Sequence, residues 1–307
     1  MAIIGNDRVH RLGSGIHHSE AVLVDRAGFV IGFGRDRGAC RVSPDGVTER
    51  FAELPEGTIP NGTVIDDNGD YIYCCLGRKA MMRLTPAGKA SLWVDQVAGV
   101  PLLIPNFCTH DAEGNLYVSV TSTKRDFSRV FEEVMNPEPN GALVRIRPDG
   151  RGELVTAGLW LANGTAIDPK EEAVYVLQSG TKDLVRVPIR KDGGFGKPEI
   201  FAKDFPGIPD GMAFDVKGNC YVTCIFNHSR DADGNISLVA CNQIIKVDPN
   251  GQWEPLIEDH SGKIEHPSNC AFGGPDMKRL YIANMEADHF AYADLDIEGH
   301  KLRHQRP

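Results

Sequence analysis

The chain has 307 residues, of which 24% are charged and 41% are hydrophobic, and its formal net charge is −9. These values are ordinary for a globular protein, and the acidic balance argues against nucleic acid as a partner. No apolar stretch approaches the roughly 20 residues needed to cross a bilayer, so we expect no membrane partner. The first eleven residues carry charges and no long apolar run, so we predict no signal peptide.

Eight cysteines are spread along the chain without a compact framework. Several, such as Cys74, Cys220 and Cys224, lie in apolar runs where a thiol packs as a small hydrophobic group. We therefore predict reduced thiols and a cytoplasmic location. The spacing of Cys220 and Cys224 is not matched by a second pair, which argues against a zinc site.

In chain order, short β-rich segments follow two alternating templates. The first is an acidic or glycine turn followed by a β-rich run, and its six copies begin near Asp25, Asp66, Asp111, Asp168, Asp215 and Gly274. The second is a β-rich run that ends in a Pro/Asp/Gly turn, and its copies cover residues 40–46, 82–88, 143–150, 184–193, 244–251 and 291–299. Six copies of each template in strict alternation indicate an internal repeat.

One polar residue stands in a similar context just before each copy of the first template. These residues are Glu20, Asn61, Asn106, Asn163, Asp210 and Asn269, which are separated by 41, 45, 57, 47 and 59 residues on subtraction of their numbers. A period near 50 residues is typical of propeller blades with about four strands each. We predict that residues 1–307 form a single all-β domain, a six-bladed β-propeller with four-stranded antiparallel blades. Residues 2–12 should pair with the last blade and close the ring.

Two insertions interrupt this pattern. The one from about Thr121 to Asn140, in the third blade, contains the best helix candidate, residues 126–135, with apolar side chains at helical spacing. The second, from Phe226 to Ala240, is polar and lies in the fifth blade. Each is either a lid over the axial opening or an inert surface excursion.

Equivalent positions in radial blades converge on the axis, so the six polar residues predict a ligand site there. Glu20, Asn163 and Asp210 offer only oxygen atoms, which hard divalent cations prefer. The competing interpretation, which we favour for Asn61 and Asn269, is that these residues merely mark turns. His18, close to Glu20, is either a metal ligand or proton shuttle, or a solvated or hydrogen-bonded side chain.

Three segments carry a family resemblance: residues 162–168, Ala-Asn-Gly-Thr-Ala-Ile-Asp; residues 209–215, Pro-Asp-Gly-Met-Ala-Phe-Asp; and residues 268–274, Ser-Asn-Cys-Ala-Phe-Gly-Gly. They resemble the senescence marker protein/gluconolactonase family, which includes regucalcin and bacterial sugar lactonases, over roughly residues 15–294. The resemblance implies a six-bladed propeller with one divalent metal cation (Ca, Mg, Mn, Zn or Fe) in its axial channel. It assigns Glu20, Asn163 and Asp210 to the metal, and Asn106 to the substrate or a metal-bound water.

The sequence departs from the family pattern near the implied site. Ile104 stands where an Arg is frequent, Phe107 where an Asp is usual, Gln178 where another Asp is usual, and Ala21-Val22 where Gly-Pro is usual. If Ile104 and Phe107 face the channel, the pocket suits a less hydroxylated, even apolar or aromatic, substrate. Phe107 is equally well explained as a packing residue that is turned away.

The leading hypothesis is a metal-dependent lactonase, a hydrolase that opens the ester bond of a small lactone. The metal polarises the carbonyl, Asp210 orients or deprotonates the attacking water, and Asn106 holds the substrate oxygen or that water. Substrate contacts are assigned to Asn106, Phe107, Ile104 and His18. The alternatives are isomerisation or elimination at the same metal site, and a non-catalytic propeller that binds metal. We expect a monomer or a small homo-oligomer.

Overall fold

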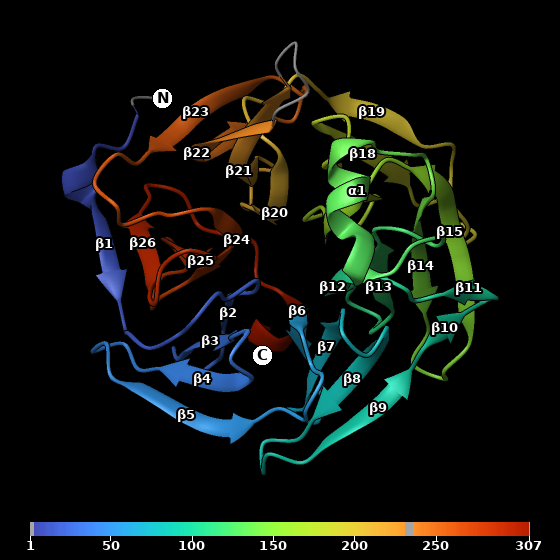
Figure 1. The fold of residues 1–307 in the computed structure, drawn as a ribbon, viewed down its shortest axis with the longest axis horizontal. Coiled ribbons are helices and arrows are strands. Elements are labelled where there is room, and N and C mark those ends of the chain that lie inside the picture. The colour runs from blue at the N-terminus through green and yellow to red at the C-terminus, as the bar shows by residue number, and fades with distance from the viewer. Residues whose placement is uncertain (1–2, 231–235, 307) are drawn as a thin grey trace.

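The computed structural model describes residues 3–230 and 236–306. It contains six four-stranded antiparallel sheets arranged around a central axis, which confirms the predicted six-bladed propeller (Figure 1). In five sheets the chain runs from the innermost strand outward, and in the sixth it does so over β24, β25 and β26, so the six innermost strands surround the axis.

The blades are numbered here in chain order. Blade 1 contains β2 (Leu23–Val24), β3 (Val30–Phe33), β4 (Gly38–Val42) and β5 (Thr48–Glu53), and blade 2 contains β6 (Pro60–Ile65), β7 (Tyr71–Cys75), β8 (Ala80–Leu84) and β9 (Ala90–Val94). Blade 3 contains β12 (Pro105–His110), β13 (Leu116–Val120), β14 (Gly141–Ile146) and β15 (Gly152–Leu159), and blade 4 contains β16 (Ala162–Ile167), β17 (Ala173–Gln178), β18 (Asp183–Pro188) and β19 (Glu199–Ala202). Blade 5 contains β20 (Pro209–Phe214), β21 (Cys220–Arg230), β22 (Ile236–Val247) and β23 (Trp253–Glu258). A small hairpin, β10 (Gln96–Val97) and β11 (Val100–Pro101), lies between blades 2 and 3 in the chain.

Blade 6 closes the ring with strands from both ends of the chain. It contains β24 (Pro267–Gly273), β25 (Arg279–Asn284) and β26 (Phe290–Asp294), and its outermost strand is β1 (Val9–Leu12). Val9 faces Ala293 and Leu12 faces Phe290 in this antiparallel pairing, which confirms the predicted closure. Before β1, Ile4 bridges Ile257 of blade 5 and residues 6–8 form the short 3-10 helix η1 (Asn6–Arg8), so the paired strand is shorter than the predicted 2–12.

The hydrophobic core is divided among the interfaces between blades. Six clusters of buried apolar side chains each join two adjacent blades, for example Phe33 of blade 1 with Tyr73 of blade 2. Both faces of the inner strands are therefore covered, which explains continuous apolar runs such as β17, whose six residues are all buried. All eight cysteines are free thiols and seven of them are buried, in keeping with the expected packing role.

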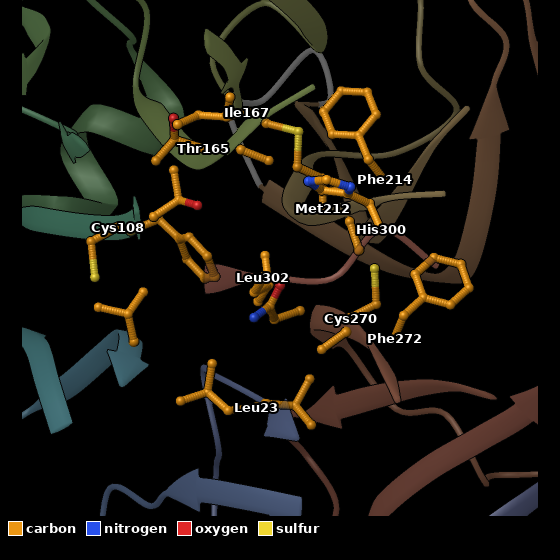
Figure 2. A pocket seen from close by; sticks show the side chains of 18 of the residues that line it. Leu23, Cys108, Thr165, Ile167, Met212, Phe214, Cys270, Phe272, His300 and Leu302 are labelled. Carbon is orange, nitrogen blue, oxygen red and sulfur yellow. The ribbon is translucent and has the colours of Figure 1, made fainter. Parts of the chain in front are cut away.

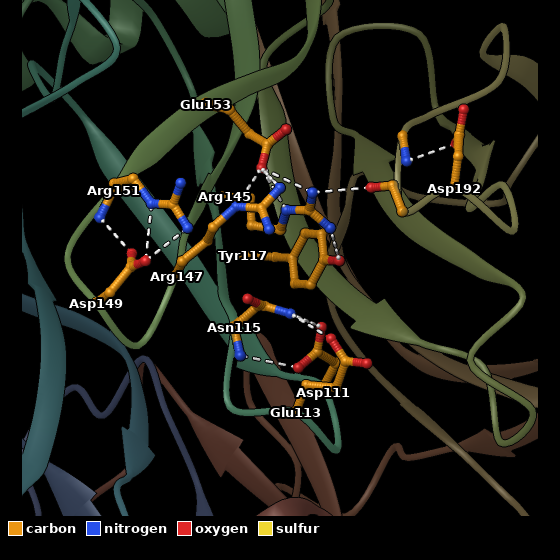
Figure 3. A network of polar contacts seen from close by, with 12 residues as sticks. Asp111, Glu113, Asn115, Tyr117, Arg145, Arg147, Asp149, Arg151, Glu153 and Asp192 are labelled. Carbon is orange, nitrogen blue, oxygen red and sulfur yellow. Dashed lines mark hydrogen bonds and ion pairs between the residues drawn. The ribbon is translucent and has the colours of Figure 1, made fainter.

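A polar network ties blade 3 to blade 4 away from the axis (Figure 3). The Arg145 side chain, only 4% exposed, pairs with Glu153 at 2.7 Å, and its guanidinium donates to the Gly193 carbonyl at 2.8 Å. It also donates to the hydroxyl of Tyr117 at 3.3 Å, and burial raises the pKa of that phenol to about 12. Tyr117 is thus a neutral acceptor at neutral pH, and the network is structural.

Helix is confined to short segments. The predicted helix at 126–135 is confirmed as the 3-10 turn η2 (Phe127–Arg129) followed by α1 (Val130–Met135), and η3 (Arg303–Gln305) lies near the chain end. The expected insertion at 226–240 is instead an extension of the β21–β22 hairpin, of which residues 231–235 lie outside the described part. Within the described residues, no helix has the length and apolar character needed to cross a membrane.

Candidate functional site

An irregularity marks the start of five innermost strands. The pairing register shifts between Pro60 and Thr63, Pro105 and Cys108, Ala162 and Thr165, Pro209 and Met212, and Pro267 and Asn269. Each shift includes or ends at one of the repeated polar residues of blades 2–6. β-Bulges interrupt the alternation of side chains and re-aim individual residues. In blade 1, Glu20 precedes the short strand β2.

Glycines after three of these polar residues allow successive inner strands to approach closely. A Cβ atom on Gly62 would lie 2.6 Å from Phe107 Cα, and one on Gly164 would lie 2.4 Å from the carbonyl oxygen of Asp210. A Cβ on Gly211 would lie 2.3 Å from Asn269 Oδ1. The Asn-Gly and Asp-Gly pairs therefore allow close packing within strands. The interpretation of Asn61 and Asn269 as turn residues is wrong, because Asn61 lies inside strand β6 and Asn269 lies inside strand β24.

Hydroxyl groups on the second strands hold the bulges in place. Phe107 N donates to Ser119 Oγ at 3.0 Å, and Gly211 N donates to Thr223 Oγ1 at 2.8 Å. Ser179, just after β17, accepts from Asn163 Nδ2 at 3.0 Å and donates to the Pro209 carbonyl at 2.6 Å. Our sequence reasoning missed these residues; the signal was a Ser or Thr at a similar place in three copies of the first template.

All six polar residues are at most 9% exposed. The Oδ1 atoms of Asn106, Asn163 and Asn269 are buried and have no hydrogen-bond partner among the described residues. Asn61 differs, because its Oδ1 accepts from Gly62 N at 2.8 Å. A buried acceptor without a partner costs roughly 1–3 kcal/mol, so three of them in equivalent positions indicate a site built to bind something.

The charge of Glu20 acts on the carboxyl group of Asp210. Burial, and then the nearby negative charge of Glu20, raise the pKa of Asp210 well above its usual range, while the Asn163 amide acts in the opposite direction. Glu20 Oε1 lies 3.1 Å from His18 Nε2 and 3.2 Å from Arg35 Nη2. Two buried carboxylates at close range need a compensating positive charge.

The donor set fits a hard divalent cation. Glu20 and Asp210 supply carboxylate oxygens and Asn163 supplies an amide oxygen without a partner, with Asn106 and Asn269 in equivalent positions. In the described part of the chain, no group of three or more His, Cys, Asp or Glu side chains could hold a metal, so a cation bound here would need amide oxygens as ligands as well. Such an oxygen-rich set suits Ca²⁺, Mg²⁺ or Mn²⁺.

The remaining predicted residues are placed as follows. His18 contacts Glu20, and its side chain is 26% exposed. Ile104 is buried, and its carbonyl accepts from Thr121 N at 2.9 Å, where the first insertion begins. Gln178 is engaged within blade 4, because its amide accepts from Trp160 N at 2.8 Å and donates to Asp183 Oδ1 at 2.7 Å.

Beneath the polar residues the axis contains a small cavity (Figure 2). It measures about 50 Å³, and its lining includes Phe107, Met212, Asn269, His300 and Leu302. This volume holds a few water molecules and no lactone ring. Because Phe107 lines this cavity together with Asn269 and Leu302, it faces a space between the polar residues and the C-terminal segment.

The C-terminal segment closes the far end of the channel. Phe214 O accepts from His300 N at 2.8 Å, and Gln305 Nε2 donates to the carbonyls of Val24 at 3.1 Å and Phe272 at 3.0 Å. Arg303 pairs with Asp67 of the β6–β7 turn and donates to Ala112 O after β12, and Arg306 pairs with Glu171 before β17. The segment thus contacts all six blades, and its end lies near the axis in Figure 1. A small molecule would therefore have to reach the polar residues from the opposite face.

The insertion at 121–140 lies on that opposite face and reaches blades 1 and 2. It leaves blade 3, yet Asp126 Oδ2 lies 2.8 Å from Lys79 Nζ of blade 2. The ring of Phe127 lies 5.2 Å from the guanidinium carbon of Arg35 in blade 1. Its base is held by the buried Glu133, which accepts from Ser122 Oγ and Asn140 Nδ2, both at 3.0 Å. These contacts support the interpretation of this insertion as a lid.

Fold and site together describe a six-bladed propeller whose axial channel is closed at one end and lined by oxygen donors near the other. Residues 35–286 match the family model described as the SMP-30/Gluconolactonase/LRE-like region, and the chain belongs to this family. This confirms the resemblance seen in the sequence.

Individual relatives agree with this assignment. The chain is 27% identical over 164 residues to a 6-deoxy-6-sulfogluconolactonase of Pseudomonas putida. The matched region covers 52% of this chain and 50% of that protein. It is 27% identical over 225 residues to a gluconolactonase of Zymomonas mobilis, covering 69% of this chain and 57% of the relative. The chain therefore spans about half the length of these curated relatives. A gluconolactonase structure from Xanthomonas campestris superposes with a TM-score of 0.73 at 20% identity, covering 94% of this chain and 89% of that one, which shows the shared fold.

Proposed function

We propose that this protein is a metal-dependent lactonase that hydrolyses the ester bond of a small lactone. The observation that carries the proposal is the buried set of Glu20, Asn163 and Asp210, in which the charge of Glu20 helps to raise the pKa of Asp210 and the amide oxygen of Asn163 has no partner. Family membership supports the same reaction, since the two relatives described above are named as lactonases.

In this proposal Glu20, Asn163 and Asp210 hold one divalent cation. When bound, the cation polarises the lactone carbonyl and stabilises the negative charge that develops on its oxygen. Asp210 orients the attacking water and accepts its proton.

The other side chains position the substrate. Asn106 is buried beside the bulge of blade 3, and we assign its side-chain amide to the substrate oxygen or the attacking water. His18 reaches the mouth and touches Glu20, so it can contact the substrate or pass a proton to solvent. The lid and the closed far end exclude bulk water, which strengthens electrostatic interactions in the site.

We further propose a substrate with few ring hydroxyls. Ile104 offers no side-chain hydrogen bond where relatives often carry Arg. Phe107, where Asp is usual, lines the small cavity beneath the polar residues, so it adds no hydrogen-bonding group to the site either. A buried hydroxyl without a partner costs roughly 1–3 kcal/mol, which is about a tenfold to hundredfold loss in preference. The substrate is therefore expected to be a less hydroxylated lactone than gluconolactone.

The test is hydrolysis of a lactone panel, followed with a pH indicator, by protein treated with a chelator and then reloaded with Ca²⁺, Mg²⁺ or Mn²⁺. We expect turnover only after reloading, and none in Asp210→Ala or Asn163→Ala. Asn61→Ala is the matched control, because Asn61 occupies the equivalent position but its Oδ1 is already bonded to Gly62. Hydrolysis that survives chelation, or equal activity in Asn163→Ala and Asn61→Ala, would refute the proposal.

A further inference from the structure

We propose that Arg35 selects substrates that carry a negatively charged substituent close to the ester group. This inference rests on the proposed lactonase function and names the substrate class for it. Arg35 lies between the lid and the oxygen donors, and the other cationic side chains around it are paired with carboxylates of their own.

Arg35 lies in the turn between β3 and β4, on the lidded face of blade 1. Its backbone N donates to the His17 carbonyl at 2.9 Å, which fixes the turn against the segment that leads to Glu20. Its Nη2 lies 3.2 Å from Glu20 Oε1, and its side chain is 36% exposed. The guanidinium therefore reaches both the buried carboxylate and the space under the lid.

The other cationic side chains of the lid region have carboxylate partners of their own. Lys79 pairs with Asp126 at 2.8 Å, and Arg125 pairs with Glu133 at 2.8 Å and with Glu138 at 2.7 Å. Among the ion pairs of the described residues, Arg35 takes part in a single one, and its partner is the proposed cation ligand Glu20. When a divalent cation occupies the site, Glu20 binds that cation, and Arg35 then loses its only carboxylate partner among the ion pairs of the described residues.

The charge balance of the loaded site then favours an anion. Glu20 and Asp210 together neutralise a divalent cation, so the positive charge of Arg35 is left over. This leftover positive charge lies in a chain whose overall net charge is −9. A guanidinium released from Glu20 presents a planar fork of donors that matches a carboxylate or sulfonate.

The lid orients this fork. The Phe127 ring lies 5.2 Å from the guanidinium carbon, a distance at which a cation is attracted to an aromatic face. Contact with Phe127 restricts the side chain beside the site, so less conformational entropy is lost when it binds an anion. An anion held there lies next to Glu20, and hence next to the reacting ester.

The first experiment uses two matched substrates: γ-butyrolactone with a carboxylate on the carbon next to the ring oxygen, and the corresponding carboxamide. We expect the protein to prefer the carboxylate in kcat/KM by about tenfold or more, the range typical of a charge-assisted hydrogen bond. Arg35→Ala should lose this preference, and Arg35→Lys should keep part of it. Arg37→Ala is the matched control, because Arg37 lies in the same turn but pairs with the exposed Glu53 at 2.7 Å. A preference that persists in Arg35→Ala would overturn the proposal, as would equal rates for the two lactones in the unmodified protein.

The second experiment needs no turnover. Calorimetry measures binding of Mn²⁺ to chelator-treated protein, and then binding of the ring-opened dicarboxylate to the Mn²⁺-loaded protein. Arg35→Ala should bind Mn²⁺ several-fold more tightly, because a competitor for Glu20 has been removed, and should bind the dicarboxylate about tenfold or more weakly. Unchanged affinities for both would contradict the proposal. If neither lactone is hydrolysed, the lactonase function fails while this binding result still decides the role of Arg35.

Discussion

Asn163 donates its side-chain amide to Ser179 Oγ at 3.0 Å and keeps its own Oδ1 buried without a partner. The same hydroxyl donates to the Pro209 carbonyl at 2.6 Å, directly before Asp210. One side chain of blade 4 thus fixes the orientation of Asn163 and the start of the strand that carries Asp210. The orientation of two proposed cation ligands, Asn163 of blade 4 and Asp210 of blade 5, therefore depends on Ser179, which is not itself a proposed ligand.

Ser179→Ala should weaken cation binding by about tenfold to a hundredfold, the usual effect of removing a group that orients a metal ligand. Without the hydroxyl, the Asn163 amide can rotate away from the site. The measurement is the calorimetric dissociation constant for Mn²⁺. Ser43→Ala provides the comparison, since Ser43 Oγ accepts from Val47 N at 3.1 Å in an exposed turn of blade 1. Equal affinities in the two variants would show that Ser179 has no role in the site.

Asp210→Asn should stabilise the cation-free protein, and the gain should grow with pH. The folded pKa of Asp210 is raised above that of an unfolded aspartate, which is about 3.9. As pH rises from about 4, the unfolded chain loses this proton first, so the carboxyl group increasingly favours unfolding. Thermal unfolding with a chelator should show a higher Tm for Asp210→Asn at pH 7 and no difference near pH 4. With cation added, the order should reverse at pH 7. A constant difference across this pH range would contradict the assigned burial of the charge.

Glu133→Ala should loosen the lid. Glu133 is 1% exposed and accepts hydrogen bonds from Ser122 and Asn140, besides its 2.8 Å pairing with Arg125. Without this carboxylate the donors of Ser122 and Asn140 lose their acceptor, and each buried donor left without a partner costs about 1–3 kcal/mol. Limited proteolysis should therefore cut within residues 121–140 much faster in this variant. Glu132→Ala is the control, because the neighbouring Glu132 is exposed and pairs with Arg129 on the surface. Similar cleavage rates in the two variants would mean that Glu133 does not hold the lid.

Gln305→Ala should lower stability and leave the chemistry intact. The variant loses two hydrogen bonds that tie the C-terminal segment to blades 1 and 6, each worth about 0.5–1.5 kcal/mol. The free energy of unfolding should fall by about 1–3 kcal/mol while kcat stays unchanged, because this segment closes the face opposite the lid. Lys301→Ala, at an exposed position of the same segment, should change neither quantity. A large fall in kcat for Gln305→Ala would show that the segment acts on the site.

The repeated part of the molecule was predictable because it recurs. Turn chemistry and β-rich runs marked every blade, and the phase of the repeat placed Glu20, Asn163 and Asp210 at the starts of inner strands or just before them. Asn61 was misinterpreted because a glycine that follows Asn can serve either a turn or close packing, and the sequence does not separate these uses. Asn61 is also bonded to Gly62, so equal position in the repeat does not imply equal availability.

Features outside the repeat could not be found in this way. Arg35 meets Phe127 only because the lid of blade 3 crosses the mouth, and no periodic signal connects those residues. The C-terminal segment lies beyond the last template, and its contacts with six blades depend on the closed ring. The bulges and the hydroxyls of Ser119, Ser179 and Thr223 follow from local pairing geometry, which template matching does not resolve.

The most direct test of the central claim is a stepwise titration of chelator-treated protein with Mn²⁺ while lactone hydrolysis is followed in the same sample. The account predicts no turnover at the start, a rise in proportion to added cation, and saturation at about one cation per chain, in keeping with a single divalent site. Full turnover before any cation is added would contradict it, as would activity that is indifferent to bound cation.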